Sequence, residues 1–140
     1  MDTSFLSEIN WIAVFCAAFA YFGLGAFWYS KLLFVNAWLK MTGIDANSED
    51  AKKGVGATMG LSFICMLLIC AGLSILRYRL DLQGSLSGLK LGLFTGLIFS
   101  TAIIAINYLY EKKSIGLLLI NGGYALVGQV VAAMIICTWF

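Results

Sequence analysis

The charged residues of this chain are spaced so that four long uncharged stretches remain. They cover residues 9–30, 54–76, 91–110 and 114–139. A helix needs about 20 apolar residues to cross the ~30 Å hydrocarbon core of a bilayer, so each stretch is long enough to span a membrane once. The pattern predicts an all-α membrane protein in which four transmembrane helices form an up-down bundle, a single transmembrane domain over residues 1–140.

The connection after the first stretch differs from an ordinary loop because its opening part is strongly apolar. Residues 31–41 read KLLFVNAWLKM, a segment too short to cross a bilayer. On a helix its apolar side chains gather on one face, which predicts a short interfacial helix after the first span. Farther along, Ser48 is a favourable N-cap that Glu49 follows. We therefore expect the second helix to begin there, before it enters the membrane.

Composition narrows the chemistry that these spans can perform. Of the 140 residues, 61% are apolar and 11% charged, and the chain contains no histidine. No acidic or basic residue lies inside a predicted span. Proton relays and voltage sensors need intramembrane charge, and a serine nucleophile needs a base. We therefore expect no enzyme activity and no catalytic residue.

The cysteines do not suggest a metal or redox site. The chain has four of them, and they are Cys16, Cys65, Cys70 and Cys137. All fall within predicted spans, without CxxC spacing, and we interpret them as small apolar side chains. The sequence thus predicts no metal, no cofactor and no nucleic-acid partner.

Basic residues are divided unequally between the two sides of the predicted bundle. Six lie in connections opposite the termini and three on the terminal side. Because basic residues favour the cytoplasmic side, we expect both termini to lie outside the cytoplasm. The larger group consists of Lys31, Lys40, Lys52, Lys53, Lys112 and Lys113.

Small residues at four-residue spacing predict where the helices approach each other closely. Such stripes are typical of helix packing in lipid, where backbones meet without bulky side chains between them. Packing within one bundle explains them, and contact with a second copy of the chain in a homo-oligomer is the alternative. The predicted packing residues are Gly56, Gly60, Gly88, Gly92, Gly96, Ser100, Gly128 and Ala132.

Polar side chains near the predicted turn between the third and fourth spans form the candidate binding site. Helix rise puts Asn107 and Asn121 about 6 and 12 Å below that turn, and Tyr124 lies one turn beyond Asn121. Glu111 shares a helix face with Asn107. These residues form either a hydrogen-bond clamp between helices or a site for a lipid or small polar ligand. The complete predicted site is Trp28, Tyr29, Asn107, Glu111, Asn121 and Tyr124.

Three motifs carry a resemblance to a known family. They are INWIAV at residues 9–14, GAFWYSKLLFVNAW at residues 25–38 and INYLYEKKSIGLLLINGGYALV at residues 106–127. In these motifs the chain resembles the small bacterial membrane proteins of the domain of unknown function 1761 family. The resemblance implies a four-helix protein of a bacterial inner membrane, with no assigned activity and no catalytic residue.

Together these observations favour a non-enzymatic helical bundle of the bacterial inner membrane. We expect it to lie in the lipid bilayer, to form a homo-oligomer and to bind a lipid or small polar ligand. The alternative is a small transporter or channel, in which an oligomer surrounds an uncharged path lined by polar side chains.

Overall fold

The computed structural model describes residues 4–139, and over this range the chain consists of helices and turns, with no strand. Four helices are long and apolar enough to cross a membrane, which confirms the all-helical prediction: α1, α4, the continuous helix α5–η2–α6, and α7. The elements in chain order are the 3-10 helix η1 (Ser4–Ser7), α1 (Trp11–Trp28), α2 (Val35–Thr42), α3 (Glu49–Lys52), α4 (Val55–Arg79), α5 (Gly84–Phe94), the π-helical segment η2 (Thr95–Thr101), α6 (Ala102–Tyr110) and α7 (Ile115–Thr138).

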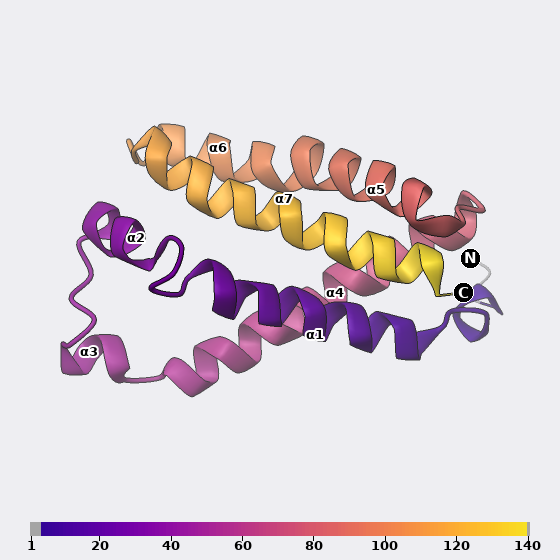
Figure 1. Ribbon diagram of the computed structural model, residues 1–140, viewed down its shortest axis with the longest axis horizontal. Coiled ribbons are helices and arrows are strands. Elements are labelled where there is room, and N and C mark those ends of the chain that lie inside the picture. Colours follow the sequence, from indigo (N-terminus) through magenta and orange to yellow (C-terminus); the bar gives the residue numbers. More distant parts are fainter. Residues whose placement is uncertain (1–3, 140) are drawn as a thin grey trace.

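The long helices extend lengthwise through the molecule (Figure 1). Helix η1 and the last turn of α7 lie at one end, which we call the terminal end. Helices α2 and α3 and the turn between α6 and α7 lie at the other, which we call the loop end. Helix α7 is the centre of the packing, because it contacts α1, α2, α4 and all three parts of the third span.

Polar side chains define where several helices begin. The side chain of Asn10 accepts the N–H of Ala13 (3.1 Å) at the start of α1. The Ser114 hydroxyl accepts the N–H of Leu117 (3.2 Å) at the start of α7. Each of these side chains satisfies a backbone donor that has no partner inside its own helix.

Ser48 does cap a helix, but this helix is not the second span. Its hydroxyl accepts the N–H of Ala51 (3.1 Å), and the short helix α3 then ends at Lys52. Gly54, with φ of 76°, turns the chain into the separate helix α4. The expectation of one helix running from Glu49 into the second span is therefore wrong, because a left-handed residue, which glycine adopts readily, interrupts it.

The third span starts earlier than the uncharged stretch suggested. Its helix begins at Gly84, whereas the prediction placed the span at residues 91–110. Lys90 lies inside this helix with an exposed side chain, and a long lysine side chain can extend its charge away from an apolar helix surface. The other three spans differ from their predicted limits by three residues or fewer.

Small residues allow α1 and α7 to pack closely. Ala17 and Ala132 are completely buried. A Cβ atom on Gly128 would lie 1.9 Å from an atom of the Tyr21 ring. The ring of Tyr21 therefore occupies space that only a glycine on α7 leaves open.

A row of glycines on the third span, which we call the glycine seam, lies against α7. The seam consists of Gly88, Gly92 and Gly96. A Cβ atom on the first two would come within 2.5 and 2.4 Å of α7 backbone atoms, and a Cβ atom on the third within 2.9 Å of the Leu126 side chain. Absent side chains thus set the close approach of these two helices, a mode of packing that is typical of helix pairs in lipid.

Beyond the glycine seam, the π-helical segment η2 forms polar contacts with α7. The side-chain amide of Gln129, which is buried, donates a hydrogen bond to the Ser100 hydroxyl. The Thr101 hydroxyl donates to the carbonyl of Gly122 (3.2 Å). These bonds satisfy polar groups that would be costly in lipid, and they attach the third span to α7 beyond the seam.

Candidate functional site

Helix α4 belongs to the bundle along only part of its length. Its buried residues are Cys70, Leu73 and Ser74, all in its second half, whereas residues 52–61 are exposed throughout. In Figure 1, α4 crosses α1 and then diverges from it toward the loop end. The other helices therefore cover the first half of α4 less than its second half.

Two adjoining cavities lie beside the first half of α4, and we call them together the lateral groove. Their volumes are about 400 and 490 Å³. Helices α1, α4 and α7 supply the walls, and both cavities are open to the outside of the bundle. The lining residues common to both are Thr58, Ser62, Met66 and Tyr124.

Three tyrosines form the side of the groove opposite α4. The rings of Tyr21 and Tyr29 each lie 5.3 Å from the ring of Tyr124, in edge-to-face arrangements. The Tyr124 hydroxyl donates to the carbonyl of Tyr21 (3.3 Å), and the Tyr21 hydroxyl donates to the carbonyl of Ala125 (3.3 Å). Aromatic contacts and hydrogen bonds together fix this wall.

A polar cluster behind this wall joins three helices. The Tyr29 hydroxyl, just past the end of α1, donates to the side-chain oxygen of Asn121 on α7 (2.7 Å). The side-chain amide of Asn121 in turn donates to the Tyr108 hydroxyl on α6 (2.6 Å). Nearby, the indole N–H of Trp28 donates to the carbonyl of Ile120 (3.0 Å). We call Tyr29, Asn121 and Tyr108 the amide cluster.

The structure brings together four of the six predicted site residues. Trp28, Tyr29, Asn121 and Tyr124 lie in or beside the groove wall. Asn107 and Glu111 lie outside it, with exposed side chains that form no hydrogen bond within residues 4–139. The binding role of all six stays a prediction.

Other residues in the groove or beside it were not part of the predicted site. Tyr108, and not Asn107, is hydrogen-bonded to Asn121. Thr58 and Ser62 are spaced four apart on α4, which puts both hydroxyls on one helix face. That spacing was visible in the sequence, but nothing in the sequence indicated that α4 diverges there.

The predicted packing residues also divide into two groups. Gly88, Gly92, Gly96, Ser100, Gly128 and Ala132 lie in contact with a neighbouring helix. Gly56 and Gly60 are exposed, and a Cβ atom on either would have no atom of residues 4–139 within 4 Å.

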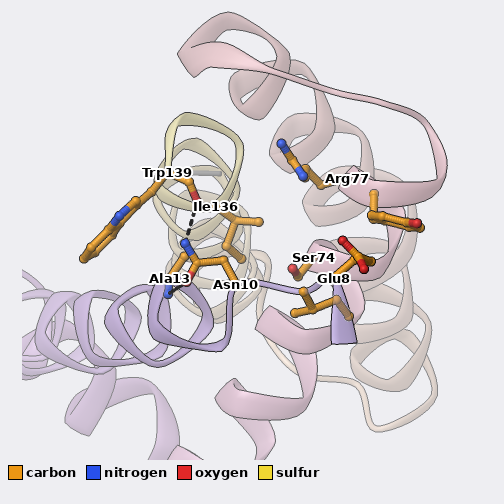
Figure 2. A pocket seen from close by; sticks show the side chains of 9 residues that line it. Glu8, Asn10, Ala13, Ser74, Arg77, Ile136 and Trp139 are labelled. Atoms are coloured by element: carbon orange, nitrogen blue, oxygen red, sulfur yellow. Dashed lines mark hydrogen bonds between the residues drawn. The ribbon is translucent and has the colours of Figure 1, made fainter. Parts of the chain in front are cut away.

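A second, much smaller cavity lies at the terminal end (Figure 2). Its volume is about 30 Å³, and Glu8, Ser74 and Arg77 are among the residues that line it. Beside it, the side-chain amide of Asn10 donates to the carbonyl of Trp139 (3.4 Å). A cavity of this size has space for only a few water molecules, so it does not suit an organic ligand.

The reactive side chains that line the groove are hydroxyls and the thiol of Cys65. Within residues 4–139, no three His, Cys, Asp or Glu side chains come together as metal ligands would. The four cysteines are free thiols. The groove lining therefore offers hydroxyl, thiol and apolar groups, which can bind and orient a molecule by hydrogen bonding and contact.

The fold and the groove define an all-helical protein with four candidate membrane spans. Residues 12–137 match the family described as "Protein of unknown function (DUF1761)", and the chain belongs to this family. The match confirms the resemblance carried by the three sequence motifs, and it includes every residue that lines the lateral groove. No curated protein and no solved structure matches the chain significantly.

Proposed function

We propose that this protein binds a membrane lipid in the lateral groove and performs no reaction on it. In this proposal the four spans cross a bacterial inner membrane in alternating directions, α2 lies in the interface, and both termini lie outside the cytoplasm. The lengthwise arrangement of the helices supports the alternation (Figure 1). The six lysines at the loop end support the orientation.

The observation that carries the proposal is an apolar groove between helices that can cross a membrane. Its two cavities have volumes within the range of ~300–1,000 Å³ that is typical of ligand sites. Leu61, Met66 and Ile69 contribute apolar wall on α4. A groove that opens sideways within a bilayer is exposed to acyl chains, which fit apolar walls without any loss of hydrogen bonds.

The groove also offers a few polar groups to the less apolar part of a lipid. The Thr58 hydroxyl donates to the carbonyl of Gly54 (3.1 Å), which leaves its lone pairs able to accept. Ser62, one turn farther along α4, presents a second hydroxyl to both cavities. These hydroxyls suit the ester region between the acyl chains and the headgroup of a glycerolipid.

Self-association is part of this proposal, through a different face of α4. Gly56 and Gly60 lie about 160° around the helix from Thr58 and Ser62, at ~100° per residue. Small residues four apart favour close contact between helices in lipid. A second copy packed on this face leaves the lateral groove open.

Native mass spectrometry after release from mild detergent tests lipid binding directly. The Ser62→Trp variant places a large ring in the groove and should lose most of the lipid that the wild-type protein retains. Leu68→Trp is the matched control, because Leu68 is 68% exposed on α4 and lines neither cavity. Retention of lipid by both variants at the wild-type level would contradict the proposal. A size-exclusion profile like that of the wild type establishes that each variant is folded.

A further inference from the structure

We infer that the lateral groove selects lipids with an anionic headgroup, and that Lys31, Lys52 and Lys53 provide the selection. The inference rests on the proposed lipid-binding function and adds the chemical class of the ligand. It comes from the combination of an apolar groove with basic residues at one of its ends.

The three lysines lie just beyond two of the helices that line the groove, α1 and α4. Tyr29, which lines the groove at the end of α1, is two residues before Lys31. Thr58, which lines it on α4, is five residues after Lys53. The chain between these flanks runs through α2 and α3 at the loop end (Figure 1). A lipid whose acyl chains occupied the groove would therefore have its headgroup near the lysines.

Lys31, Lys52 and Lys53 share their connection with acidic residues but do not pair with them. The three lysine side chains are exposed and form no ion pair within residues 4–139. The Asp45 carboxylate accepts the backbone N–H of Asn47 (2.9 Å). Glu49 and Asp50 stand in the first turn of α3. The ammonium groups at the groove end, which form no ion pair with the described residues, are thus available to a ligand.

The charge of the headgroup decides which lipids this arrangement favours. A phosphodiester without an amine brings one negative charge to the lysines. A zwitterionic headgroup also brings an ammonium group, which the lysines repel. Each lysine near an anionic membrane surface strengthens binding to that surface about fivefold. We therefore expect the wild-type protein to prefer the anionic lipid at least fivefold.

Competition between two lipids tests the selection. Delipidated protein is mixed with equal amounts of phosphatidylglycerol and phosphatidylcholine that have identical acyl chains, and native mass spectra give the bound ratio. The triple variant Lys31→Gln, Lys52→Gln, Lys53→Gln should retain lipid but bind the two in nearly equal amounts. The control variant Lys112→Gln, Lys113→Gln removes charge from the other turn at the loop end and should keep the wild-type ratio.

The outcomes separate this inference from the function on which it rests. Equal binding of both lipids by the wild-type protein, with binding still lost in Ser62→Trp, would overturn the selectivity and leave the groove as a lipid site. An equal loss of preference in both lysine variants would also overturn the inference, because the selection would come from overall surface charge. Lipid retention that is insensitive to Ser62→Trp would instead overturn the proposed function.

Discussion

Among single residues, Asn121 forms the most connections in the candidate site. Its side-chain oxygen accepts from Tyr29 and its amide donates to Tyr108, so one side chain joins the end of α1, α6 and α7. Asn107, the other asparagine near this turn, is exposed. The two asparagines should therefore differ in their effect on stability.

We predict that Asn121→Leu lowers the free energy of unfolding by about 1 kcal/mol, the usual size of an interhelical hydrogen-bond contribution in membrane proteins. The thermal midpoint in mild detergent measures it. Asn107→Leu is the control and should leave the midpoint nearly unchanged. Equal midpoints for the two variants would show that the amide cluster does not stabilise the bundle.

Among the helices, the pairing of α5 with α7 depends on the glycine seam. We predict that Gly92→Ala destabilises the protein by about 1–3 kcal/mol, the usual cost of overpacking. The added Cβ would lie 2.4 Å from the Cα of Val130, and backbone atoms cannot move aside as a flexible side chain can. Thermal unfolding in detergent measures the loss of stability of the Gly92→Ala variant.

Gly60→Ala on α4 makes the same chemical change where the added atom meets nothing within residues 4–139. In a monomer it should be neutral or stabilising by up to about 1 kcal/mol, because alanine favours helix more than glycine does. A loss of stability as large as that of Gly92→Ala would mean that the destabilisation does not arise from contact with α7.

The sequence was sufficient to predict the spans but not how they pack. The charge-free stretches predicted the four long helices, because a charged side chain inside a lipid bilayer is costly. The break at Gly54 was missed because a single glycine before an apolar stretch does not reveal its φ. Helix rise predicts the depth of Asn107 and Asn121 but not the helix face on which each side chain lies. The divergence of α4 depends on contacts with other helices, which no local pattern records.

For the whole molecule, the proposed orientation in the membrane can be tested with added cysteines. We predict that Gln83→Cys, at the terminal end, reacts with a membrane-impermeant thiol reagent in intact cells. Asn47→Cys, at the loop end, should react only after the cells are permeabilised. Both positions are exposed. The wild-type protein is the control, because its own cysteines lie within α1, α4 and α7. The opposite labelling pattern would reverse the orientation.

The π-helical segment η2 determines which side chain of α6 meets Asn121. Asn107 follows Gly96 by eleven residues, so at ~100° per residue an uninterrupted α-helix would turn it only about 20° from the glycine seam. In the same uninterrupted helix, the side chain of Tyr108 would point about 120° away from the glycine seam. The wider turn of η2 takes up about one extra residue, and Tyr108 faces α7 instead. Deletion of one residue from 97–101 would convert η2 into α-helix and leave Tyr108 eleven residues after Gly96, so the phenol would keep its contact with Asn121.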